Sequence, residues 1–134
     1  MNQMPDFSFE KAERLKSRKI IQALFKQGNS FAQYPLRLVW LPVENRQSSY
    51  PSQFALSVPK RKFKRAVDRN RIRRMLREAY RLNKHHLYRA LQDEEQQIAF
   101  MVLYIAAEEL PFAQIEGAMY KLIRRFAKQY RKRR

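Results

Sequence analysis

The chain has 134 residues, of which 45% are hydrophobic, and a formal net charge of +17 at pH 7. Its length fits one domain with a single modest core, and its hydrophobic fraction favours a folded chain over a disordered one. Cysteine is absent, which excludes disulfides and thiolate chemistry, while so large a positive charge on a small domain indicates a polyanionic partner.

Residues 1–16 show neither helical nor strand periodicity, and Phe7 and Phe9 predict an extended arm with aromatic anchors. The arm lacks the charged and then apolar pattern of a secretory signal. The longest apolar run, residues 98–107, is about half the length that a membrane helix needs. We therefore expect a soluble protein that is not exported and works in the cytoplasm.

The first predicted helix covers residues 18–27, with Ser17 as its N-cap and Gly28 as its stop. Its large apolar side chains are Ile20, Ile21, Leu24 and Phe25. These are many for one face of a short helix. Two interpretations therefore stay open: all four lie in the core, or some of them border a groove.

Two strands are predicted next, over residues 36–41 and 53–58. In both segments a large apolar side chain recurs at every second position, and alternate side chains of a strand point to the same face of a sheet. Pro42 is expected to end the first strand and Pro59 the second, since proline cannot donate a ladder hydrogen bond. The polar and aperiodic residues 43–52 predict a mobile hairpin loop.

The most informative segment is residues 60–81, about half of which are Lys or Arg, with only Asp68 and Glu78 acidic. A helix is predicted to start near Arg69, with Asp68 as its cap. Its apolar side holds Ile72, Met75, Leu76 and Ala79. The opposite side is almost entirely arginine, whose planar fork suits phosphate oxygens.

A solvated basic face and a membrane-bound helix are the alternatives for this segment. Ordinary exposed helices mix charges of both signs, whereas this polar face does not. Helices that lie on membranes need an exposed bulky apolar face, and the narrow apolar side here suffices only for a core. Nucleic acid is therefore the preferred partner.

After Arg81 the sequence is interpreted as a polar linker that can continue as a frayed or separate helical turn to about Leu91. It contains His85 and His86, which are expected to face different directions and so to make a poor metal pair. The residues 98–106 are apolar on both alternating faces, which predicts a central strand covered on both sides.

Apolar residues recur at three- and four-residue steps from Phe112 to Tyr130 and predict an amphipathic helix that begins near Pro111. Residues 131–134 are expected to form a disordered basic tail. The order is therefore α-β-β-α-β-α, which is a single-domain α+β sandwich of one sheet with helices.

The segment Arg69–Glu78, preceded by Lys60-Arg61 and Ala66-Val67, resembles the RNR motif of the bacterial ribonuclease P protein subunit. The resemblance covers nearly the whole chain and extends to Glu13-Arg14-Leu15, Leu24–Gly28, Ala55–Val58 and Leu110–Ala113. It implies the same element order, a ribosomal-protein-like fold and a left-handed βαβ crossover, although the general rule predicts a right-handed one.

The acidic residues and histidines form no spaced acid–base or metal-binding constellation, so no catalytic or metal-binding residue is predicted in this chain. The resemblance implies the protein component of an endoribonuclease ribonucleoprotein. Its RNA subunit would remove the 5′ leader of precursor tRNA with magnesium, and the protein itself would need no cofactor. The implied partners are ribonuclease P RNA and precursor tRNA, with no membrane and no required protein partner.

The resemblance places RNA contacts at Arg69, Asn70, Arg73, Arg74 and Arg77, and the basic segment adds Lys60, Arg61, Arg65, Arg71 and Arg81. It also implies a cleft for the single-stranded leader, lined by Ile21, Phe25 and Trp40. Ile21 stands where many family members have an aromatic residue. The alternatives are a small ribosomal or other structured-RNA-binding protein without an enzymatic role, and a DNA-binding module.

Overall fold

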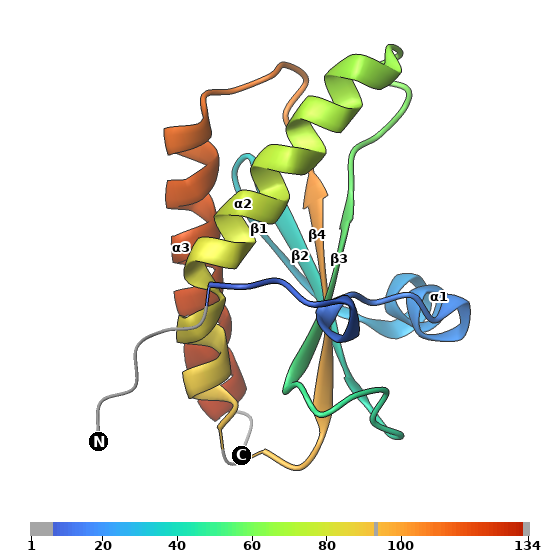
Figure 1. Ribbon diagram of the computed structural model, residues 1–134, viewed down its shortest axis with the longest axis vertical. Helices are drawn as coiled ribbons and strands as arrows, with labels where there is room; N and C mark the ends of the chain where they lie inside the picture. The colour runs from blue at the N-terminus through green and yellow to red at the C-terminus, as the bar shows by residue number, and fades with distance from the viewer. Residues whose placement is uncertain (1–6, 93, 133–134) are drawn as a thin grey trace.

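The computed structural model describes residues 7–92 and 94–132. A single 3-10 turn, Lys11–Glu13, precedes three helices and four strands (Figure 1). In chain order these are α1 (Arg18–Gln27), β1 (Asn29–Gln33), β2 (Leu36–Val43), β3 (Ser52–Ser57), α2 (Ala66–Ala90), β4 (Gln97–Tyr104) and α3 (Phe112–Lys132). The predicted α+β class and element order are confirmed, with β1 as an additional strand.

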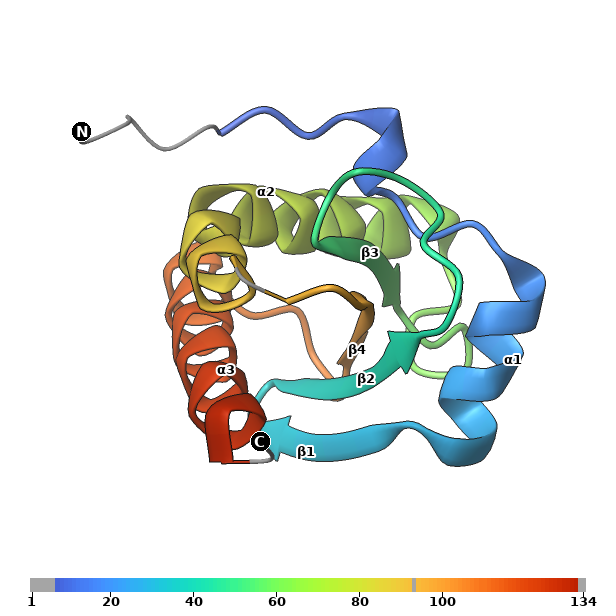
Figure 2. The ribbon, with the colours of Figure 1, turned by 90° about the horizontal axis from the view of Figure 1, so that it is seen from below.

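The four strands form one mixed sheet in the order β1-β2-β4-β3, in which only the β3–β4 pair is parallel. Helix α2 joins these parallel neighbours. When the strands point up and the face under α2 and α3 is toward the viewer, β4 lies to the left of β3 (Figure 1 and Figure 2). The crossover is therefore left-handed, as the resemblance implied.

The sheet lies between two helical layers, with α2 and α3 on one face and α1 on the other (Figure 2). Trp40 and Phe100 face α2 and α3, in the larger core. Val39 and Met101, their chain neighbours, face the smaller core that Leu24 of α1 completes. Strand β4 is buried on both faces along nearly its whole length, which confirms the prediction of a central strand.

Helix α1 has the predicted bounds and caps. The backbone N–H of Ile20 donates to the Ser17 hydroxyl at 3.3 Å, and the N–H of Gly28 donates to the Leu24 carbonyl at 2.9 Å. A Cβ on Gly28 would lie 2.5 Å from that carbonyl oxygen and 2.6 Å from Cγ1 of Val39. Glycine is therefore required where α1 meets β2.

The predicted bounds of the Arg-rich helix are wrong at both ends. Helix α2 begins at Ala66, with Arg65 as the N-cap residue, and Asp68 lies inside its first turn. It then continues without a break through the predicted linker to Ala90, because Leu87 extends the buried stripe. The buried amide of Asn83 donates to the Ala79 carbonyl at 2.8 Å, which a helical register allows.

Strand β1 escaped prediction because it is short, lies at the sheet edge and carries a single buried side chain, Phe31. The expectation that Pro42 ends β2 is also wrong, since Pro42 pairs with Ile98 inside the strand. Pairing with β1 stops at Trp40, so β2 has an open edge at Pro42, where the missing N–H is tolerated.

Residues 44–51 do not form a hairpin, because β4 lies between β2 and β3. The guanidinium of Arg46 organises this connection by donating to four backbone carbonyls at 2.8 to 3.3 Å. The acceptors are the carbonyls of Ser48, Ser49, Tyr50 and Glu95.

The N-terminal arm is extended apart from its 3-10 turn, and Phe9 anchors it with edge-on ring contacts to Phe54 and Tyr80. Residues 1–6 of the predicted arm lie outside the described residues. At the other end α3 includes Arg131, so the predicted tail is helical there, while 133–134 lie outside the described residues. No helix of the described chain is long and apolar enough to span a membrane.

We predict that Leu76→Ala lowers the free energy of unfolding by about 2 to 5 kcal/mol, since Leu76 is fully buried under α2 and its truncation leaves a cavity. Val67→Ala, on the same helix but 50% exposed, should change it by less than about 0.5 kcal/mol. Urea unfolding of both variants measures the difference. Equal losses would contradict the assignment of the two faces of α2.

Candidate nucleic-acid interface

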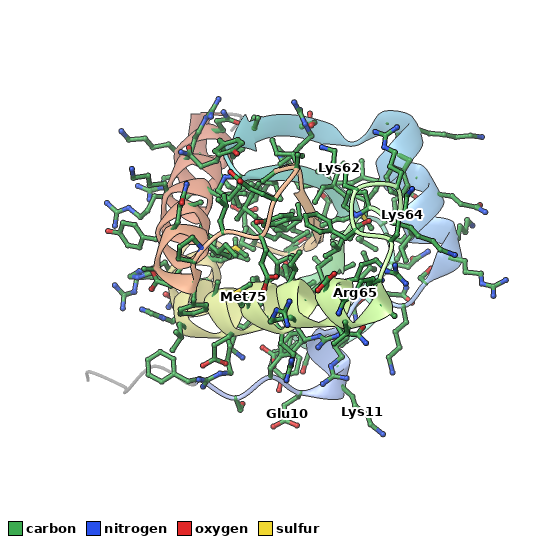
Figure 3. All side chains as sticks on the ribbon, turned by 90° about the horizontal axis from the view of Figure 1, so that it is seen from above. Glu10, Lys11, Lys62, Lys64, Arg65 and Met75 are labelled. Carbon is green, nitrogen blue, oxygen red and sulfur yellow. The ribbon has the colours of Figure 1, made fainter. Side chains whose placement is uncertain are left out.

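The first half of α2 has the two faces that its sequence predicts. Ile72 and Leu76 are fully buried against the sheet, whereas Arg74 and Arg77 are exposed and Arg73 is half-buried. The apolar side therefore holds the helix in place, and the arginines point away from the core. Figure 3 shows Lys64 and Arg65 at the end of α2 that lies beside α1, where the basic segment begins.

A groove of about 460 Å³ lies beside these arginines. Its floor is the outer part of β3, with Ala55, Leu56 and Ser57, and Met101 of the neighbouring β4. Three separate elements form its walls. They contribute Ile21 and Phe25 from α1, Arg73 and Arg77 from α2, and Phe9, Arg14 and Leu15 from the arm.

The α1 wall of this groove is apolar. Phe25 is 64% exposed, Ile21 is half-buried, and only Leu24 belongs fully to the core. The structure thus decides between the two interpretations of this helix in favour of the second, since some of its large side chains border a groove. So exposed a phenylalanine ring is accessible to a stacking partner.

The opposite wall of the groove is cationic. Burial, and after it the charges of Arg14 and Arg73, lowers the pKa of Arg77, although a guanidinium stays protonated at neutral pH. Within the described residues no carboxylate forms a salt bridge with any of these three arginines. An anion in the groove would therefore relieve the repulsion among them.

The arm wall is held by a buried ion pair that sequence reasoning missed. Lys84 Nζ lies 2.5 Å from Oε1 of Glu13, and both side chains are at most 1% exposed. The Tyr88 hydroxyl donates to the same Glu13 oxygen at 2.6 Å, and Lys84 also donates to the Ser8 carbonyl. These bonds position Arg14, the residue after Glu13, at the groove.

Comparison with known proteins gives the family. The family model for ribonuclease P matches residues 9–127. The ribonuclease P protein component of Porphyromonas gingivalis is 44% identical over 130 residues, which cover 95% of this chain and 92% of that protein. That of Chlorobaculum tepidum is 36% identical over 109 residues, covering 75% and 70%. The chain belongs to the ribonuclease P protein family.

Solved structures agree in fold. The ribonuclease P protein of Staphylococcus aureus has a TM-score of 0.65 at 24% identity, covering 88% of this chain and 97% of that one. The Thermotoga maritima protein has a TM-score of 0.66 at 20% identity, covering 84% and 96%. The role of this chain is that of the protein subunit of the ribonuclease P ribonucleoprotein, in tRNA processing, which implies association with ribonuclease P RNA.

Three of the predicted RNA-binding arginines have close carbonyl or carboxylate partners within the chain, and a fourth, Arg65, lies 3.6 Å from the Asp68 carboxylate. Arg69 donates to the carbonyls of Phe63 and Lys64 and so closes the turn before α2. Arg71 pairs with Glu109 at 2.5 Å and with Asp68 at 2.9 Å, and Arg81 pairs with Glu78 at 2.6 Å. A phosphate that binds the guanidinium of Arg69, Arg71 or Arg81 must therefore compete with these intramolecular partners.

The remaining predicted RNA contacts are solvent-exposed and lie outside the groove between α1 and α2. They are Lys60, Arg61, Arg65, Asn70 and Arg74. The side-chain oxygen of Asn70 accepts a hydrogen bond from Arg73 at 3.1 Å, which orients that guanidinium at the groove. The sequence did not place Arg14 and Phe9 at the groove, because their position depends on the docking of the arm.

The prediction that Trp40 lines the leader cleft is wrong. Trp40 is 4% exposed, and its ring centroid lies 5.1 Å from that of Phe126 and 5.7 Å from that of Tyr130 in α3. It therefore lies on the face of the sheet opposite α1. The alternation along β2 decides this, since Val39 and not Trp40 points toward α1.

The two adjacent histidines are also arranged differently from expectation. The ring centroids of His85 and His86 lie 3.9 Å apart, so the side chains do not diverge. No group of three or more metal-ligating side chains that could hold an ion occurs among the described residues.

We predict that Trp40→Ala destabilises the fold by about 3 to 5 kcal/mol, because it removes a large buried ring. Phe25→Ala should change the free energy of unfolding by less than about 0.5 kcal/mol, because Phe25 is 64% exposed. Denaturant titrations compare the two variants directly. A Phe25→Ala loss as large as that of Trp40→Ala would mean that Phe25 serves the core.

Proposed function

We propose that the exposed arginines of α2 bind ribonuclease P RNA and that the groove between α1, α2 and the arm holds the single-stranded 5′ leader of precursor tRNA. The observation that carries this proposal is the placement of Phe25 and Ile21 opposite Arg73 and Arg77 across one groove. The proposed site of action is the cytoplasm, where precursor tRNA is processed.

The two walls of the groove suit the two chemical parts of a single strand. Guanidinium groups bind phosphates, while an exposed aromatic ring stacks on bases, and each stacked base contributes roughly 1 to 3 kcal/mol with little sequence preference. The floor is largely apolar and presents few side-chain donors or acceptors to base edges. A groove of this kind accepts leaders of different sequence.

In this proposal the RNA subunit carries out the cleavage reaction, and the protein subunit binds RNA. Neither a carboxylate nor an imidazole is among the described residues that line the groove, so the lining offers no protein group for general acid–base work there. The magnesium that the reaction needs would then be held by the RNA. The protein would contribute by binding and orienting the substrate beside the RNA active site.

Reconstitution tests this function. We expect the protein to increase cleavage of precursor tRNA by a bacterial ribonuclease P RNA at low magnesium, and to cleave nothing in the absence of that RNA. Lys19→Ala, an exposed change outside the groove, should stimulate cleavage as the unaltered protein does. Failure of the unaltered protein to stimulate cleavage would refute the proposal.

The contributions of the two walls to RNA binding should differ in how strongly they depend on salt concentration. Arg73→Ala or Arg77→Ala is expected to flatten the dependence of log K on log salt by about 0.7 to 0.9 for each phosphate that the variant no longer binds. Phe25→Ala should keep that slope and lower the affinity for leader-bearing tRNA only, by about 1 to 3 kcal/mol. Fluorescence anisotropy with leader-bearing and mature tRNA measures both effects. Equal losses for the two RNAs would show that Phe25 does not contact the leader.

A further inference from the structure

A second basic concavity lies on the other side of the molecule, between the C-terminal half of α2 and helix α3. These two helices run side by side on the sheet face opposite α1 (Figure 2). The concavity has a volume of about 710 Å³, and none of its lining residues belongs to the leader groove. The RNR segment has no part in it, because its only α2 residues are His86, Arg89 and Ala90.

Six Lys and Arg side chains, all exposed, line this second groove, and no Asp or Glu does so among the described residues. They are Arg89, Lys121, Arg124, Arg125, Lys128 and Arg131. The five on α3, at positions 121, 124, 125, 128 and 131, fall within about a third of the helix circumference, which places them in one stripe about 15 Å long. None of the six forms a salt bridge within the described chain.

The stripe is held in a defined place. The Arg125 guanidinium donates to the Ala32 carbonyl at 2.9 Å and lies 4.3 Å from the centre of the Phe31 ring, which ties α3 to the edge strand β1. The Arg124 guanidinium lies 5.8 Å from the centre of the Tyr120 ring. Two of the cations are therefore oriented by neighbours that neutralise no charge.

The surroundings of His86 indicate the sign of the local field. The pKa of His86 is lowered chiefly by burial, and further by the positive charges of the nearby His85, Arg124 and Arg89. Tyr120, which is 41% exposed and packs edge-on against His86, is the only other aromatic ring among the described lining residues. With so little to stack on, the groove suits phosphates better than unpaired bases.

A lipid surface fits these residues less well than RNA does. Helices that bind membranes insert bulky apolar side chains below the headgroups. Here the aliphatic lining consists of Ala90, Ala127 and the fully buried Ile123, none of which can be inserted, and the exposed Tyr120 ring packs edge-on against His86. The cations thus surround a groove that lacks a bulky aliphatic side chain to insert between lipids.

We propose that the α2–α3 groove is a second phosphate-binding site, which takes the backbone of a double-stranded segment of structured RNA. Arg73 and Arg89 are sixteen positions apart on α2, or about 24 Å along its axis, so both grooves can be occupied at once. The inference rests on the proposed function in one respect, in that the RNA subunit is taken as the source of the duplex.

The test compares two double variants of the full chain that remove the same charge. Arg124→Ala/Lys128→Ala removes two cations of the second groove, while Lys19→Ala/Lys26→Ala removes two exposed lysines of α1 that line neither groove. The probe is an RNA duplex of about 16 base pairs without single-stranded ends. Equal melting temperatures would show that both variants fold.

We expect Arg124→Ala/Lys128→Ala to make the slope of log K for duplex binding against log salt less steep by about 1.8. Two phosphates are then no longer bound, and each contributes about 0.9 to the slope. The α1 pair should leave the slope unchanged. The same loss for both pairs would overturn the inference and identify a solvated basic face. So would a loss of binding to phosphatidylserine vesicles with unchanged duplex binding, which would identify a membrane surface.

Leader-bearing and mature tRNA separate this inference from the proposed function. Arg124→Ala/Lys128→Ala should leave the ratio of the two affinities unchanged, since the leader groove is intact, and a changed ratio would count against a separate site. If the protein stimulates cleavage but the two double variants bind duplex alike, only the second site is refuted. If duplex binding depends on Arg124 and Lys128 but cleavage is not stimulated, only the proposed function is refuted.

Discussion

The constraint on which this structure depends is that α2 must bury one side completely while it exposes arginines on the other. Ile72, Leu76, Ala79, Tyr80 and Leu87 are all fully buried. The Tyr80 ring stacks on Phe54 of β3 with a centroid distance of 3.9 Å and an interplanar angle of 9°. The position of each guanidinium thus follows from the packing of this stripe, because side chains on one helix keep their mutual spacing.

A second dependence links the protein interior to the groove between α1 and α2 through the ion pair of Glu13 and Lys84. Removing one partner of a buried ion pair leaves an uncompensated charge and typically costs about 3 to 5 kcal/mol. Here the pair also connects the arm to α2, and Phe9 and Arg14 reach the groove from that arm. One side of the proposed RNA-binding groove is therefore built on an interaction inside the protein.

The large positive charge is divided between two uses. Arg46, Arg69 and Arg71 stabilise the fold itself, through carbonyls that would otherwise need water or through carboxylates. Other cations gather in two grooves, where their mutual repulsion opposes folding and a bound polyanion would relieve it. Since a ligand that binds only the folded state stabilises it, the RNA should also raise the stability of this domain.

The sequence alone determined the features that depend on neighbouring residues, namely helix ends, a buried strand and the two faces of a helix. Ser17 and Gly28 bound α1, the apolar run of β4 predicts a central strand, and the spacing of Ile72 and Leu76 assigns the two faces of α2. The resemblance at Arg69–Glu78 was enough to predict the family. Only the tertiary structure decided the interior place of Trp40, the continuation of α2 past Arg81, and the contact of Glu13 with Lys84. Each of these depends on residues far apart in the chain, and no local pattern records which face of a sheet another element will cover.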